Sequence, residues 1–346
     1  MWTVIGQTKA VALLERSLQR GSLAHAHLFV GPSHVGKMTL ALNLAQALNC
    51  TGTTPPCGEC ASCQKILSMR HADVQVIGLG RNGDTTEARS KTEISIEQIR
   101  DLQHTASLPP FEGRYKVFII EQAELLSSEA ANCLLKTLEE PADKVVFILL
   151  TANERRLLTT VVSRCQRLEL LPLPAAQIGA ALVDSWKIEP EKAALLARLA
   201  HGCLGWAISA AVDDSLLQRR AERLDEWLNI IRADNEERFA GAARLATQFG
   251  QSRDSVREKL DLWLDWWRDL LLTKVGCTDA VTNIDRLATL TEMSRGYTLA
   301  QMNMVSRSIQ LAERQLRMNA NPRLVLEVLM LDIPPAAKSK IEYITN

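Results

Sequence analysis

Residues 31–39, GPSHVGKMT, have the spacing of a phosphate-binding loop. Gly31, Gly36 and Lys37 stand at the places that the pattern G-x-x-x-x-G-K-[ST] requires. In such a loop, backbone N–H groups and the N-terminus of the next helix face phosphate oxygens, and the lysine reaches the outer phosphates. The apolar run HLFV before the loop and the helix-like segment after it supply the expected context. The sequence therefore predicts the geometry of a nucleotide site that could hold ATP or ADP.

The residue after this lysine departs from the pattern. Met38 stands where a hydroxyl would hold Mg²⁺, and a thioether is a poor ligand for that hard cation. Thr39 is one residue further on and is therefore rotated by about 100° around the helix, which points its hydroxyl away unless the register shifts. Thr39 stays a candidate nucleotide contact, but Mg²⁺ binding is in doubt.

An acidic segment, Glu121-Gln122-Ala123-Glu124, follows the apolar run KVFII. Hydrolysis by this class of site needs an acid at a neighbouring strand end to hold Mg²⁺ and, in many members, an adjacent Glu that activates water. Glu121 could hold the metal, whereas Gln122 has no carboxylate to accept a proton. Together with Met38, Gln122 favours a site that does not turn nucleotide over efficiently. The alternative is that Glu124 or another residue compensates.

Half of the eight cysteines crowd into residues 50–63 with the spacing C-x6-C-x2-C-x2-C. A C-x2-C turn can aim two sulfurs at one metal, and four thiolates suit tetrahedral Zn²⁺. Four protein ligands leave no open coordination position, so the predicted zinc is structural. Its ligands are Cys50, Cys57, Cys60 and Cys63. The remaining four cysteines are scattered and read as buried or inert residues.

The composition sets limits on the class of protein. The chain has 346 residues, 40 basic and 40 acidic, and 47% hydrophobic residues, which predicts two or three folded domains. Its zero net charge argues against a surface that binds nucleic acid all over, although a local basic patch remains compatible with it. No apolar run is long enough to span a bilayer and the N-terminus does not resemble a signal peptide, so we expect a cytoplasmic protein without membrane contact.

The elements that position these residues change in type along the chain. Up to about residue 172, strand-like runs at 27–30, 73–77, 116–120, 145–150 and 167–170 alternate with helical stretches, which predicts a parallel sheet with ligands at the carboxyl ends of its strands. Ser95 and Gln98 form a capping box for a helix that ends before Pro109. The polar segment 78–93 is expected to be a surface loop.

After residue 172 the pattern is helical, with a predicted break near 201–207. This gives an α/β domain at 1–172, helical domains at 173–215 and 216–335, and a loose tail at 336–346. Trp263, Trp266 and Trp267 lie on an amphipathic stripe, which favours packing in a core; a subunit interface is the alternative.

These motifs, in this order, resemble the bacterial DNA polymerase III clamp loader. The resemblance is carried by VIGQ (4–7), GPSHVGK, the four-cysteine module, ANCLLKTLEEP (131–141), SRC (163–165) and NANPRLVLEVLML (319–331). It implies an AAA+ P-loop domain with a parallel sheet and an inserted zinc module, followed by an all-α lid and an all-α collar that joins the subunits. The implied partners are the gamma/tau and delta subunits and, through the complex, the sliding clamp and primed DNA.

Two kinds of subunit share these features, the gamma/tau motor and the delta-prime stator. The motor is expected to carry G-K-[ST], D-E and an Arg that senses the γ-phosphate, whereas this chain reads Met38, Glu121-Gln122 and Gly205-Trp206 at those places. The resemblance is therefore to the delta-prime type. An active gamma-like ATPase is the alternative, and a zinc-dependent DNA-binding module is disfavoured by the neutral charge. Nothing in the sequence resembles a polymerase active site.

The resemblance also assigns roles to residues outside the loop. Arg164 of SRC corresponds to the arginine that reaches the γ-phosphate bound by a neighbouring subunit. Thr151 corresponds to a position that orients a γ-phosphate or water. Residues 5–7 correspond to the segment that brackets the adenine in relatives.

Overall fold

The structure of the protein is a computed structural model that describes residues 1–79 and 93–335. Contacts between residues divide the chain into two compact units. The first holds Met1–Ser185 and Ala200–Trp206, and the second holds Trp186–Leu199 and the chain from Ala207 onward. The predicted division at residues 172 and 215 stays a prediction. Most of the loop expected at 78–93 and all of the tail expected at 336–346 lie outside the described residues.

A five-stranded parallel sheet in the order β2-β3-β4-β1-β5 forms the centre of the first unit. The strands are β1 (Ala26–Val30), β2 (Val74–Ile77), β3 (Lys116–Ile120), β4 (Val145–Thr151) and β5 (Gln166–Glu169). Strands β1, β3 and β4 are buried along their whole length, as expected of a parallel sheet covered on both faces. The predicted α/β fold with a parallel sheet is confirmed.

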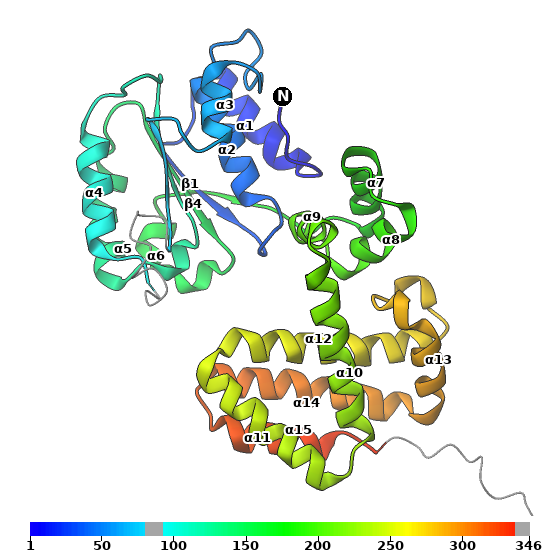
Figure 1. The fold of residues 1–346 in the computed structure, drawn as a ribbon. Coiled ribbons are helices and arrows are strands. Elements are labelled where there is room, and N and C mark those ends of the chain that lie inside the picture. The colour runs from blue at the N-terminus through cyan, green and yellow to red at the C-terminus, as the bar shows by residue number, and fades with distance from the viewer. Residues whose placement is uncertain (80–92, 336–346) are drawn as a thin grey trace, which may run out of the picture. The chain divides into compact units, whose positions relative to one another are not determined.

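Helices cover both faces of this sheet (Figure 1). Leu14 and Leu44 pack with Ile148 in the core on one face, and Leu134 packs with Phe147 in the core on the other. The helices of the first face are α1 (Thr8–Gln19), α2 (Lys37–Asn49) and α3 (Ala61–Leu67). Those of the second face are α4 (Ile96–Ser107), α5 (Ser128–Glu139) and α6 (Thr159–Val162).

Local signals in the sequence set several helix ends. The capping box of α4 is present, because the Oε1 atom of Gln98 accepts a hydrogen bond from the Ser95 N–H at 3.1 Å. The break expected near 201–207 is confirmed, since residues 200–203 separate α8 from α9 and Gly202 has a left-handed φ of 84°. The helices here are α7 (Ala175–Trp186), α8 (Pro190–Leu199) and α9 (Leu204–Val212).

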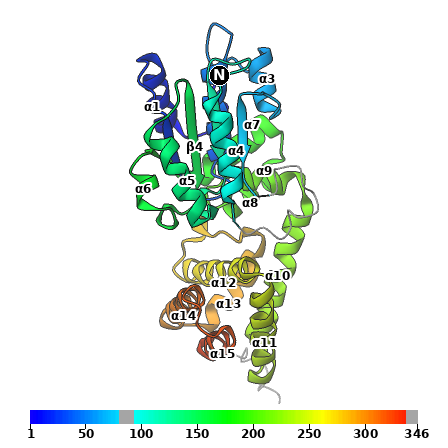
Figure 2. The same ribbon diagram turned by 90° about the vertical axis from the view of Figure 1, so that its left-hand side faces the viewer.

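Long helices build most of the second unit, in which α11 packs on α15 and α12 packs on α14 (Figure 2). They are α10 (Asp214–Arg232), α11 (Asn235–Gln251), α12 (Arg253–Lys274), α13 (Leu287–Gly296), α14 (Leu299–Arg317) and α15 (Pro322–Asp332). Trp263, Trp266 and Trp267 are buried in the core of this unit, so the interpretation of the tryptophan stripe as core packing is confirmed. Within the described ranges, no helix is both long and apolar enough to cross a membrane.

Replacement of Trp263 by Ala should destabilise the second unit strongly. The Trp263 ring is 2% exposed and stacks on Trp227 with ring centroids 3.8 Å apart, so the variant leaves a cavity. We expect a loss of about 3–5 kcal/mol in the free energy of unfolding, measured by urea denaturation with far-UV circular dichroism. The matched control is Trp186→Ala, because Trp186 is 37% exposed. Equal losses in the two variants would contradict the packing described here.

Candidate functional site

The phosphate loop lies between the end of β1 and the start of α2, at the carboxyl edge of the sheet. The path of the backbone requires glycine at both positions of the pattern, Gly31 and Gly36. A Cβ at Gly31 would lie 2.5 Å from the carbonyl oxygen of Leu170, which no side chain tolerates. Gly36 has a φ of 107° and caps α2 in the left-handed conformation that glycine adopts without strain. The predicted loop geometry is present.

The Lys37 side chain folds back onto this loop. Its Nζ atom donates hydrogen bonds to the carbonyl oxygens of Gly31 at 2.6 Å and Pro32 at 2.8 Å. Burial lowers the pKa of the Lys37 ammonium, while the nearby charges of Glu124 and Glu121 act in the opposite direction. A nucleotide phosphate would therefore compete with the two carbonyl oxygens for the same ammonium.

A cavity of about 340 Å³ lies over the loop and gathers most of the predicted nucleotide contacts. Gly36, Lys37, Thr39 and Glu121 all line it. Met38 lines it too, so a thioether stands at the position where a hydroxyl would hold Mg²⁺. Thr39 remains part of the lining despite its rotation from Met38. The cavity has the chemistry to accept an anion, but the first turn of α2 offers no hydroxyl at position 38.

Of the acids near Lys37, Glu124 has the larger effect in opposing the lowering of the lysine pKa, and the sequence indicated it only as a possible compensating residue. It lies in a short 3₁₀ helix, Ala123–Leu125, directly after Gln122. Its Oε1 atom accepts a hydrogen bond from Ala152 N at 3.2 Å. Its Oε2 atom is buried and has no hydrogen-bond partner among the residues that the structure describes. Gln122 also lines the cavity, and no carboxylate replaces it at that position.

Thr151 ends β4 beside the loop and is fully buried. Its hydroxyl oxygen accepts a hydrogen bond from Asn153 N at 3.0 Å. This hydrogen bond stabilises the turn after β4. Its neighbours Leu150 and Ala152 line the cavity. The role of Thr151 toward a γ-phosphate stays a prediction.

The start of α9 touches the phosphate loop directly. Gly205 N donates a hydrogen bond to the carbonyl oxygen of His34 at 2.9 Å. A Cβ at Gly205 would lie 2.9 Å from the same oxygen, so any side chain here would force the loop or the helix to shift. A motor subunit is expected to carry an Arg at this position. Here the residue is Gly205, and the close contact with His34 requires a glycine.

Arg164 lies outside this cavity, just after α6. Its Nη1 atom donates to the carbonyl oxygen of Thr160 at 2.9 Å, and its Nη2 atom pairs with Oε1 of Glu139 at 2.6 Å. The Arg164 side chain is 35% exposed. Sequence reasoning did not single out Glu139, although this residue belongs to the quoted segment ANCLLKTLEEP.

The N-terminal segment is tied to the chain just after β5. The Nε2 atom of Gln7 donates to the carbonyl oxygen of Leu171 at 2.8 Å, and Leu171 N donates back to Oε1 of Gln7 at 3.3 Å. Gly6 has a φ of 75° and faces the Leu173 side chain. These contacts fix residues 5–7 in place, and their predicted contact with adenine stays a prediction.

The four clustered cysteines converge where the end of α2 meets the start of α3, with Cys50 just after α2 and Cys63 inside α3. Their Sγ atoms all lie within 4.8 Å of one another, with 3.9 Å between Cys57 and Cys63 and 4.0 Å between Cys60 and Cys50. Four sulfurs at about 2.3 Å from a tetrahedral Zn²⁺ would be about 3.8 Å apart, so the cluster fits this ion. Backbone N–H groups point at the sulfurs, as Cys60 N does toward Cys57 Sγ at 3.3 Å. Gly58 supports the turn with a φ of 79°.

A parallel sheet, a phosphate loop after β1, an acidic segment after β3 and a four-cysteine cluster after α2 define a P-loop domain of the AAA+ type. Residues 6–174 match the family model described as DNA polymerase III, delta subunit. The chain is 28% identical to DNA polymerase III subunit delta' of Bacillus subtilis, over 94% of this chain and 95% of that protein. The family-model match and this relative support a clamp-loader AAA+ subunit of DNA polymerase III.

Other relatives and solved structures match with different coverage. The tau subunit of Escherichia coli is 38% identical over 60% of this chain, but the match spans only 31% of that protein. The tau subunit of Bacillus subtilis is 26% identical over 95% of this chain and 60% of that protein. A gamma subunit-related protein of Thermotoga maritima aligns over 92% of this chain and 97% of its own with 16% identity and a TM-score of 0.44.

Removal of one sulfur should abolish metal binding by the cysteine cluster. We expect about one zinc per wild-type chain and a large loss of zinc in Cys60→Ser, because a hydroxyl is a poor substitute for a thiolate. Metal content after dialysis is measured by mass spectrometry. The control is Cys277→Ser, since Cys277 is an exposed free cysteine of the second unit. Full retention of zinc by Cys60→Ser would contradict the assignment.

Proposed function

We propose that the chain is a delta-prime-type subunit of the clamp loader. In this role it joins gamma/tau and delta subunits and helps to place the sliding clamp on primed DNA during replication. It does not hydrolyse ATP efficiently, its zinc module is structural, and it works inside the cell in the cytoplasm. The match to the Bacillus subtilis delta' subunit over nearly the full length of both chains supports this proposal.

The observation that carries the proposal is the set of groups at the phosphate cavity. Lys37 and Glu121 are present, but Met38 offers no hydroxyl for Mg²⁺ and Gln122 cannot act as a base. Gly205 lies so close to His34 that a guanidinium at this position would disturb the loop. Three different parts of the catalytic machinery are absent at their expected positions, and each would have to be compensated separately.

Arg164 gives the chain a part in hydrolysis by a neighbour. In the proposed ring its guanidinium reaches the γ-phosphate held by an adjacent motor subunit and stabilises the charge that develops during transfer. The partial exposure of Arg164 supports this role, because the group can be reached from outside the unit. Its pair with Glu139 keeps the charge compensated while no phosphate is near.

A second candidate function is an active, gamma-like ATPase. One observation favours it: Glu124 is close enough to Lys37 to affect its pKa, and one Glu124 oxygen is buried without a hydrogen-bond partner among the described residues. In this alternative, Glu124 would take over the roles of the Mg²⁺ ligand missing at Met38 and the base missing at Gln122. The two functions differ in whether the isolated chain hydrolyses ATP.

Removal of the Arg164 guanidinium should lower ATP hydrolysis by the assembled loader. We expect ATP turnover at the interface that contains Arg164 to fall by a factor on the order of 10³. The total rate of the loader then falls by the fraction of hydrolysis that this interface contributes. The measurement is steady-state hydrolysis by gamma/tau and delta subunits mixed with wild-type chain or with Arg164→Ala.

The matched control is Arg155→Ala, because Arg155 is an exposed arginine of the same unit outside the SRC segment. Assembly of each mixture is checked by size-exclusion chromatography. An Arg164→Ala mixture that assembles and hydrolyses ATP at the wild-type rate would overturn the arginine-finger role.

A further inference from the structure

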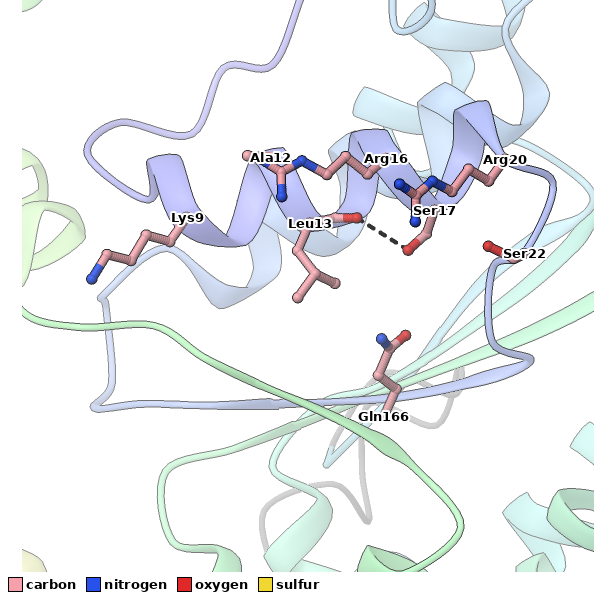
Figure 3. Close-up of a pocket in the computed structure, with 8 residues that line it drawn as sticks. All are labelled: Lys9, Ala12, Leu13, Arg16, Ser17, Arg20, Ser22 and Gln166. Carbon is pink, nitrogen blue, oxygen red and sulfur yellow. Dashed lines mark hydrogen bonds between the residues drawn. The ribbon is translucent and has the colours of Figure 1, made fainter.

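A basic groove runs between helix α1 and the edge strand β5 in the first unit (Figure 3). It has a volume of about 440 Å³. Lys9, Leu13, Arg16 and Arg20 line it from α1 and the residue just after this helix, and Gln166 lines it from the start of β5. The groove is distinct from the cavity over the phosphate loop, with which it shares no lining residue.

The three cations of the groove form a row. Lys9, Arg16 and Arg20 are separated by seven and four residues, which places them within about 40° of one another around the helix and spreads them over about 16 Å along its axis. None of the three forms an ion pair with a residue that the structure describes. The lining contains no carboxylate, and the one acid in β5, Glu169, pairs with Arg167 at 3.1 Å.

Folding alone does not account for this row. Arg16 and Arg20 lie at the C-terminal end of α1, where the helix dipole favours positive charge. Lys9 lies in the first turn, where the dipole disfavours it, and no acidic residue occupies that turn. In a chain with no net charge, a row of three cations that pair with no described residue is a local concentration of positive potential.

We propose that this groove binds the phosphodiester backbone of a DNA strand. A DNA strand carries one phosphate charge per nucleotide, about 3.4 Å apart along the axis when it is stacked as in B-form DNA, so the row spans about five phosphates of a stacked strand. The guanidinium groups of Arg16 and Arg20 and the polar side chains of Ser22 and Gln166 can donate hydrogen bonds to phosphate oxygens. Protein partners typically place an apolar or aromatic anchor in a pocket, and the only apolar lining residues of the groove are Ala12 and Leu13, so a DNA strand suits it better than an acidic peptide. The inference does not rest on the proposed subunit type.

The test is binding of a fluorescein-labelled single-stranded oligonucleotide to the full chain, followed by anisotropy between 50 and 200 mM salt. The measurement is made on the wild-type chain and on the triple variant Lys9→Gln, Arg16→Gln and Arg20→Gln. Loss of three phosphate contacts should lower the slope of log affinity against log salt by about 2 and weaken binding at 50 mM salt by about 10²-fold. Glutamine is a good helix former, so α1 should persist, as far-UV circular dichroism checks.

A charge-matched control separates the groove from general attraction. Arg295→Gln, Arg307→Gln and Arg314→Gln remove the same charge from exposed positions of the second unit. Should the triple variant of α1 misfold, Lys9→Gln alone is expected to lower the slope by about 0.7. The proposal is overturned if the chain does not bind the oligonucleotide, if the two triple variants lose affinity equally, or if poly-glutamate binds the groove more tightly than DNA does.

Discussion

The ammonium group of Lys37 is held by the carbonyl oxygens of its own loop, and the rest of the first unit is arranged around that contact. Strand β1 at the interior of the sheet delivers the loop, and Gly36 turns it into α2. The contact of Gly205 with His34 then fixes the loop from the side of α9. A buried cation needs compensation, and the loop carbonyls together with the charge of Glu124 provide it.

The phosphate loop also has a role in the fold of the first unit. The loop connects β1 to α2, and residues from both pack in the core on one face of the sheet. A change at Lys37 would remove the donor that joins two of its carbonyl groups. The charge of Arg164 is likewise compensated within the chain, by Glu139 and by the carbonyl oxygen of Thr160. Both cations are compensated inside the chain.

Much of this structure could be predicted from the sequence, because the signals are local. The runs HLFV, KVFII and VVFILL became buried strands, the capping box at Ser95 starts α4, and the spacing of the four cysteines predicted their convergence. These features depend on residues that are close in the chain. The resemblance to the clamp loader followed from motifs of the same local kind.

The features that the sequence did not reveal depend on distant residues. The pair of Glu139 with Arg164 joins the ends of two helices, and the contact of Gly205 with His34 joins segments about 170 positions apart. The groove between α1 and β5 likewise exists only once Gln166 faces the basic row of α1. No periodicity or motif encodes such pairs, because they follow from how the elements pack.

The central claim is that the phosphate loop keeps its shape without supporting catalysis by this chain. Steady-state ATP hydrolysis by the purified chain with Mg²⁺, compared with Lys37→Ala, tests it most directly. Our account predicts no turnover that depends on Lys37, because Met38 and Gln122 leave the site without a metal-holding hydroxyl and a base. Robust turnover that is abolished by Lys37→Ala would contradict it and would identify the chain as a motor.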